Sequence, residues 1–134
     1  MRAFEDLRVL VIEDEDAIRS FLEIALTSLG YHARLAADGE EGLAIFAGEP
    51  FDLVLTDVGL PGINGEEVAR IINQRSPGTP VVLLTGWAEQ ISTQIGTVEG
   101  VTRVLGKPIE LKTLAAMLAE VVPVMRTPIR LRNE

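Results

Sequence analysis

The sequence predicts an α/β protein in which a doubly wound parallel sheet is covered by helices, and three observations lead to this class. Short apolar segments rich in β-branched residues alternate with segments whose apolar residues recur at helical spacing. Hydrophobic residues make up 47% of the chain but aromatic residues only 4%, so the core is aliphatic, as is typical of strands buried on both faces. A chain of 134 residues has room for one domain. Five strands alternating with five helices then imply right-handed βαβ units.

The first predicted elements surround an acidic run. An apolar strand is expected at 7–12, and it leads directly into the four carboxylates of Glu13 to Asp16. From Asp16, apolar residues recur at helical spacing until Gly30, a residue suited to end a helix. A less apolar strand at 31–37 suits the edge of the sheet. The apolar positions of the first helix are Ala17, Ile18, Phe21, Leu22, Ala25, Leu26 and Leu29.

The next segments predict a second helix and a third strand. Asp38-Gly39 turns the chain into a helix, which Gly48 to Pro50 end. The stretch from Leu53 to Pro61 is an apolar strand stopped abruptly by glycine and proline. Asp57 therefore stands where a buried strand emerges from the core.

The third helix and the fourth strand follow the same logic. Asn64 is a good N-cap, and Glu66 and Glu67 suit the positive end of the helix dipole. Ser76 to Gly78 end this helix, and an apolar strand at 80–85 closes on Thr85.

The last third of the chain contains the weakest helix. Segment 87–98 has helical spacing, but its β-branched residues and Gly96 lower its helix propensity, so a short helix is expected. A fifth strand at 101–105 precedes Gly106 to Pro108. The final helix is marked by Leu111, Leu114, Ala115, Leu118 and Val122.

One domain is expected over 1–122, followed by a tail or truncated linker at 123–134 with Pro128 and three arginines. Twelve basic residues against 20 acidic ones give a net charge of −8, which disfavours direct binding to nucleic acid or to an anionic membrane. No segment approaches the ~20 apolar residues of a membrane span, and no signal peptide is evident. The absence of cysteine excludes thiolate chemistry, and a cytoplasmic protein without membrane insertion is expected.

Polar chemistry gathers at the strand ends. In parallel sheets, ligands bind outside the carboxyl ends of the strands. Glu13 and Asp14 follow the first strand, Asp57 ends the third, Thr85 ends the fourth and Lys107 follows the fifth. Three carboxylates without histidine or thiolate suit Mg²⁺, and such a cation would leave Asp57 ionised as a nucleophile for phosphoryl transfer. Lys107 would supply a point charge and Thr85 a hydroxyl donor to phosphate oxygens.

These strand-end residues, together with the stretch from Asp57 to Gly65 (DVGLPGING) and Lys107-Pro108, resemble the receiver (REC) domain of two-component response regulators over nearly the whole chain. The resemblance implies a flavodoxin-like three-layer sandwich with strand order 2-1-3-4-5. It implies a signalling switch rather than an enzyme. Such a switch catalyses only its own phosphorylation and its slow dephosphorylation. Asp57 would take a phosphoryl group from a phosphohistidine on a sensor histidine kinase or a histidine phosphotransfer protein, and a phosphorylation-dependent dimer is compatible with this role.

The resemblance also assigns roles to the remaining site residues. Asp14 would ligate Mg²⁺ directly, Glu13 through water and Gly59 through its backbone carbonyl, and Mn²⁺ could substitute. Thr85 would shift toward the phosphoryl group, and Lys107 would pair first with Asp57 and then with phosphate. The Lys107-Pro108 peptide would be cis. Ile18, Arg19 and Pro108 would be candidates for docking the phosphodonor.

One position departs from the family pattern. The aromatic residue often found three positions before the lysine is Val104 here, so the usual coupling between the switch threonine and a rotating ring cannot operate. We expect the signal to pass through the segment from Gly86 to Gly100 instead. His32 has no partner in the sequence and is expected to be structural, whereas Trp87 suits either core packing or partner contact.

Two other functions compete with the switch. A Mg²⁺-dependent aspartyl-phosphate phosphatase generally needs a second acid two residues after the nucleophile, where this chain has Gly59. A flavin carrier is disfavoured because the loop after the first strand is acidic, whereas an FMN phosphate needs backbone donors and neutral hydroxyls. The sequence leaves open whether the chain is a stand-alone receiver or part of a larger regulator or hybrid kinase.

Overall fold

The computed structural model describes residues 7–86 and 100–121, which form a five-stranded parallel sheet with helices on both faces. The strand order is β2-β1-β3-β4-β5, as the resemblance implied. The strands are β1 (Arg8–Ile12), β2 (His32–Ala36), β3 (Leu53–Asp57), β4 (Val81–Thr85) and β5 (Val101–Gly106). β2 lies at an edge, as predicted, while β3 and β4 are buried along their whole length.

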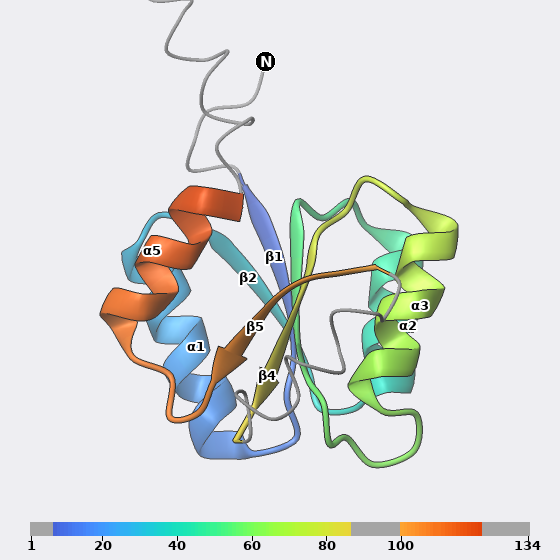
Figure 1. Cartoon of the computed structure of the whole chain (residues 1–134), viewed down its shortest axis with the longest axis horizontal. Helices are drawn as coiled ribbons and strands as arrows, with labels where there is room; N and C mark the ends of the chain where they lie inside the picture. Colours follow the sequence, from blue (N-terminus) through green and yellow to red (C-terminus); the bar gives the residue numbers. More distant parts are fainter. Residues whose placement is uncertain (1–6, 87–99, 122–134) are drawn as a thin grey trace, which may run out of the picture.

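The helices form the outer two layers of the sandwich (Figure 1). They are α1 (Asp16–Ser28), α2 (Gly39–Gly48), α3 (Gly65–Arg75) and α5 (Leu111–Val121). Helices α1 and α5 cover one face of the sheet and α2 and α3 cover the other. Successive strand residues point to opposite faces of the sheet. Leu53 and Leu55 of β3 therefore pack in the core under α1 and α5, whereas Val54 packs in the core under α2 and α3.

The helix ends follow local signals in the sequence. Asp38 and Asn64 are the N-caps of α2 and α3, and their side chains accept hydrogen bonds from the backbone N–H groups of Glu41 and Glu67. Gly30 adopts a φ of 96°, and its N–H donates to the carbonyl of Thr27 while the next N–H donates to Leu26. This is a Schellman ending, and it requires a residue without a Cβ penalty.

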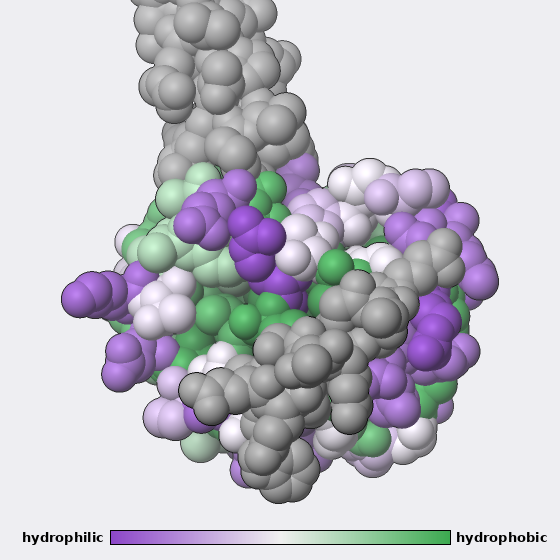
Figure 2. Space-filling view, viewed as in Figure 1, coloured by the Kyte–Doolittle hydropathy of each residue, from purple (hydrophilic) through white to green (hydrophobic). Residues whose placement is uncertain are grey.

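Two large apolar side chains are more exposed than their spacing predicted. Phe21 of α1 is 38% exposed and Leu111 of α5 is 46% exposed, although both belong to the apolar spacing of their helices. In Figure 2, hydrophobic residues reach the surface beside α5 and β5, while hydrophilic residues cover the outer sides of the helices. The predicted helix at 87–98 and the tail at 123–134 lie outside the described residues. None of the helices in the described ranges combines the length and apolar character needed to cross a bilayer.

Candidate functional site

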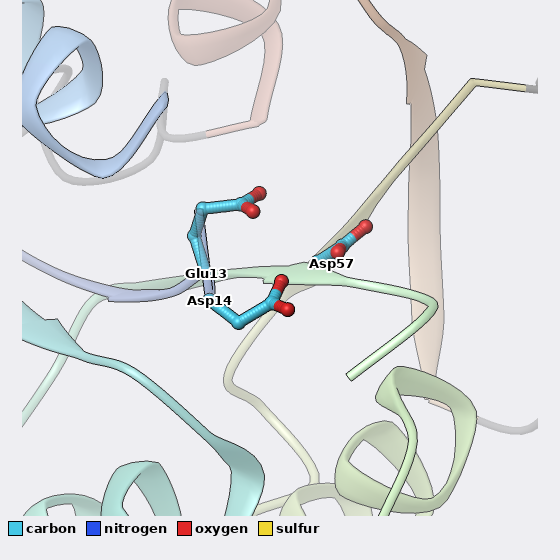
Figure 3. A group of neighbouring side chains, drawn as sticks. All are labelled: Glu13, Asp14 and Asp57. Carbon is cyan, nitrogen blue, oxygen red and sulfur yellow. The ribbon is translucent and has the colours of Figure 1, made fainter. Parts of the chain in front are cut away.

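Three carboxylates meet where β1 and β3 end (Figure 3). Glu13 and Asp14 follow β1, Asp57 is the last residue of β3, and one oxygen from each lies within 4.8 Å of the others. β1 and β3 are parallel neighbours, with Ile12 opposite Thr56 in the register, so their ends bring these residues together. Glu13 is fully buried, Asp57 is 8% exposed and Asp14 is exposed. Two carboxylates of the cluster are therefore buried, and the third, that of Asp14, is exposed to solvent.

The ammonium group of Lys107 brings a positive charge to this cluster. Its Nζ lies 3.1 Å from Glu13 Oε1, 3.1 Å from Asp57 Oδ1 and 3.9 Å from Glu15 Oε1. The loop that carries it is held to the sheet, because the Lys107 N–H donates to the carbonyl of Thr85 at 2.8 Å. The Lys107-Pro108 peptide is cis, the isomer implied by the resemblance.

The buried charges perturb each other. Burial raises the pKa of the Glu13 carboxyl and the Asp57 charge adds to this, while a hydrogen bond from the Glu15 N–H and the Lys107 ammonium act in the opposite direction and only partly offset it. Burial alone would lower the pKa of the Lys107 ammonium, but its contacts with Glu13 and Asp57 outweigh this and leave the pKa raised. Lys107 is therefore held charged between two carboxylates.

Glu13 has a carboxylate oxygen that can still accept a hydrogen bond or bind a cation. Its Oε2 accepts a hydrogen bond from the Glu15 N–H at 3.1 Å. Its Oε1 is buried and, although it is ion-paired with Lys107, no described residue gives it a hydrogen bond. A buried carboxylate oxygen in this state, beside two further carboxylates, fits a hard divalent cation or a water bound to one.

The backbone around Asp57 is enclosed on two sides. The hydroxyl of Thr56, a fully buried residue, donates to the Asp57 carbonyl at 3.1 Å. Gly65, the first residue of α3, lies so close that a Cβ there would be 2.2 Å from the same carbonyl oxygen. The Gly65 N–H also donates to the Val58 carbonyl at 2.9 Å. α3 thus begins directly against the backbone that presents Asp57.

The remaining predicted residues are placed as follows. Thr85 ends β4 next to the cluster's strand and is 5% exposed, and its register partner on β5 is Gly106. Gly59 lies exposed in the loop after β3. Val104 stands inside β5 opposite Leu83 and is partly buried, two positions short of the strand end. The strand ends therefore bring together Glu13, Asp14, Asp57, Thr85 and Lys107, while Val104 lies further back.

Comparison with protein families identifies this arrangement. The family model described as "Response regulator receiver domain" matches residues 9–119. The chain belongs to this family. It is accordingly a receiver domain of two-component signalling, a signalling module rather than a classical enzyme, and its acidic pocket is typical of a phosphoacceptor site.

Relatives of this receiver are longer proteins. It is 40% identical over 114 residues to the transcriptional regulatory protein AfsQ1 of Streptomyces coelicolor, covering 85% of this chain and 50% of that protein. It is 36% identical over 127 residues to the response regulator protein PilR of Pseudomonas aeruginosa, covering 94% of this chain and 27% of that protein. The chain thus spans half or less of these two relatives.

Solved structures of receivers share the fold. The chemotaxis response regulator CheY4 of Vibrio cholerae superposes with a TM-score of 0.81 at 32% identity, covering 87% of this chain and 98% of that one. The response regulator protein TrrA of Thermotoga maritima, solved in complex with Mg(2+)-BeF, has a TM-score of 0.78 at 30% identity, covering 86% and 98%.

The sequence did not reveal three neighbours of the site. Thr56 and Gly65 act on the Asp57 backbone, and nothing in their spacing showed that they meet there. Arg19, a candidate for docking the phosphodonor, also contacts the loop after β1, where its guanidinium donates to the Glu13 carbonyl at 2.7 Å. The only signal of this contact in the sequence was the spacing of Asp16 and Arg19, three residues apart on a helix, which allows an ion pair between them.

Proposed function

We propose that Asp57 of this receiver accepts a phosphoryl group from a phosphohistidine on a sensor histidine kinase or a histidine phosphotransfer protein. The observation that carries this proposal is the placement of Asp57 at a strand end, 3.1 Å from Lys107 and grouped with Glu13 and Asp14. A carboxylate oxygen of Asp57 attacks phosphorus. A P–O bond forms while the P–N bond breaks, and the imidazole leaves with the electron pair of that bond and takes up a proton.

The chain's own residues stabilise the transferred group. Lys107 exchanges its contact with Asp57 Oδ1 for a phosphoryl oxygen, and Thr85 donates its hydroxyl to another. Asp14, Asp57 and the carbonyl of Gly59 would hold Mg²⁺, Glu13 would act through water, and Mn²⁺ could take the place of Mg²⁺. When bound, Mg²⁺ neutralises charge on the phosphoryl oxygens. The buried, under-bonded Oε1 of Glu13 supports this ligand set.

The docking face for the phosphodonor is inferred to adjoin Lys107. A cavity of about 230 Å³ beside it is lined by Ile18, Phe21 and Pro108, among others. Ile18 and Pro108 are the docking candidates that lie on it. The receiver domain is inferred to extend over 1–122, and what the whole protein regulates depends on any segments joined to it.

The test is phosphorylation by acetyl phosphate with Mg²⁺, followed by intact-mass measurement. We expect wild-type protein to gain the mass of one phosphoryl group and Asp57→Asn to gain none. Asp38→Asn is the matched control, because Asp38 caps α2 outside the cluster and asparagine caps equally well. Phosphorylation of Asp57→Asn at the wild-type rate would contradict the proposal, and rapid hydrolysis of many phosphomonoesters would favour the phosphatase.

A further inference from the structure

Arg19 contacts the loop that carries the acidic cluster. Its guanidinium donates to the backbone carbonyl of Glu13 at 2.7 Å and forms an ion pair with Asp16, one turn earlier on α1. The Arg19 side chain is 21% exposed, whereas that of Asp16 is 91% exposed. The arginine thus spans from the first turn of α1 back to the end of β1.

This contact completes the fixation of Glu13. Its N–H donates to the Ala36 carbonyl of β2 at 3.0 Å, and its carboxylate is held by Lys107 and by the Glu15 N–H. The hydrogen bond from Arg19 restrains the one remaining polar group of this residue, its carbonyl. The N–H, the carbonyl and Oε2 of Glu13 are thus hydrogen-bonded, and Oε1 is ion-paired with Lys107, so four different parts of the chain hold this residue.

Fixing the Glu13 carbonyl also orients Asp14. The peptide bond between them is planar, so the direction of the Glu13 carbonyl determines the direction of the Asp14 N–H and the position of its Cα. Asp14 is exposed. The peptide that precedes it, fixed at the Glu13 carbonyl, is therefore the buried end from which Asp14 projects.

We propose that Arg19 is a positioning residue for the divalent cation: it holds the Glu13–Asp14 peptide so that the Asp14 carboxylate faces Asp57. This inference rests on the proposed Mg²⁺ site. Arginine suits the role because its planar fork donates in two directions at once, here to a carbonyl and to the Asp16 carboxylate.

A purely electrostatic role for Arg19 makes the opposite prediction. Glu13, Asp14, Glu15 and Asp16 are four consecutive carboxylates, and Arg19 brings a positive charge to them. Removing that charge would strengthen the attraction of the loop for Mg²⁺. Removing a positioning contact would weaken binding, as losing the outer partners of metal ligands commonly does by about 10- to 100-fold. The sign of the change in Mg²⁺ affinity therefore separates the two roles.

The experiment titrates the full chain with Mg²⁺ alone by calorimetry. Arg19→Met is expected to bind Mg²⁺ at least about tenfold more weakly. Arg19→Lys, which keeps the charge but reaches only one of the two partners, is expected to fall between this variant and wild type, and it serves if Arg19→Met does not fold. Arg70→Met is the matched control, because Arg70 makes the same kind of one-turn ion pair on α3, with Glu67 at 3.0 Å. Its Mg²⁺ affinity should equal that of wild type.

A second readout distinguishes positioning from general damage. Phosphorylation of Arg19→Met by acetyl phosphate should recover at saturating Mg²⁺, whereas Asp14→Asn should bind Mg²⁺ poorly and recover less. Unchanged or tighter Mg²⁺ binding by both Arg19 variants, with binding lost in Asp14→Asn, would overturn the positioning role and leave the metal site intact. Wild-type binding by Asp14→Asn would overturn the metal site itself.

Discussion

At the residue scale, Lys107 allows buried carboxylates to share one edge of the sheet. Its ammonium lies between Glu13 and Asp57 at equal distances of 3.1 Å, and both contacts keep it charged despite partial burial. Glu13 is the less stable partner in its charged form, because it is fully buried and burial raises its pKa. A bound cation would offset this unfavourable desolvation of the carboxylate.

This cost has a measurable pH dependence. Because the pKa of folded Glu13 lies above its unfolded value of 4.5, the folded state binds more protons, and its stability falls as pH rises through the folded pKa. Glu13→Gln does not titrate. In urea unfolding with EDTA, its free energy of unfolding relative to wild type should therefore increase from pH 4.5 toward neutrality. Glu23→Gln, an exposed position on α1, is the control for charge loss. A difference that is constant with pH would contradict this expectation.

Gly65 has a steric role, unlike the electrostatic roles of Lys107 and Glu13. A Cβ at this position would lie 2.2 Å from the Asp57 carbonyl oxygen and 3.0 Å from the Val58 Cα, and backbone atoms cannot yield as a flexible side chain can. Gly65→Ala should lower the free energy of unfolding by about 1–3 kcal/mol in urea denaturation and slow phosphorylation of Asp57. Gly48→Ala in α2, where a Cβ meets nothing within 4 Å, should be neutral or stabilising by up to about 1 kcal/mol. Equal effects of the two substitutions would refute the steric account.

At the scale of elements, α3 supports the loop that follows β3. The helix begins one residue after Asn64, and its first N–H donates to the Val58 carbonyl next to Asp57. Its N-terminal turn carries Glu66 and Glu67, which complement the helix dipole. The start of α3 and the backbone that presents Asp57 are therefore joined as one unit.

Loss of the N-cap should weaken this unit. The Asn64 side chain accepts from the Glu67 N–H at 2.9 Å. Asn64→Ala should cost about 1 kcal/mol in the free energy of unfolding, measured by urea denaturation, because that N–H loses its partner. Asn64→Asp should retain the stability, since aspartate caps as well as asparagine. If Asn64→Asp proved as unstable as Asn64→Ala, the cap would not be the cause.

At the scale of the whole molecule, the parallel sheet collects distant residues at one edge. Glu13, Asp57, Thr85 and Lys107 lie on or just after four different strands, and each strand runs in the same direction. The switch must carry a change at this edge to the rest of the domain. Val104, two positions before the end of β5, cannot supply the rotating aromatic ring that is usual in the family.

We therefore expect the change to pass through 86–100, most of which lies outside the described residues. Amide hydrogen exchange with and without a phosphoryl mimic should show altered protection across this segment. Protection of α2 (Gly39–Gly48), which packs on the other face from α5, is the internal reference. Unchanged protection in 86–100 would rule out this route.

Much of the fold was predictable because local chemistry is strong. The apolar runs of β3 and β4 identify buried strands, and Asp38, Asn64 and Gly30 mark helix ends through their own backbone bonds. The exposure of Phe21 and Leu111 was not predictable, because spacing identifies a helical face but not the width that the sheet covers.

The sequence by itself determined the described elements and, because parallel strands align their carboxyl ends, the grouping of Glu13, Asp14, Asp57 and Lys107 at one edge. Only the tertiary structure decided which of the consecutive carboxylates is buried and which is exposed. Neighbouring acidic residues look alike in a sequence, and the buried one, Glu13, is paired with Lys107, which is more than 90 residues away in the chain. The same holds for Arg19 and Gly65, whose roles come from contacts between elements that no local pattern records.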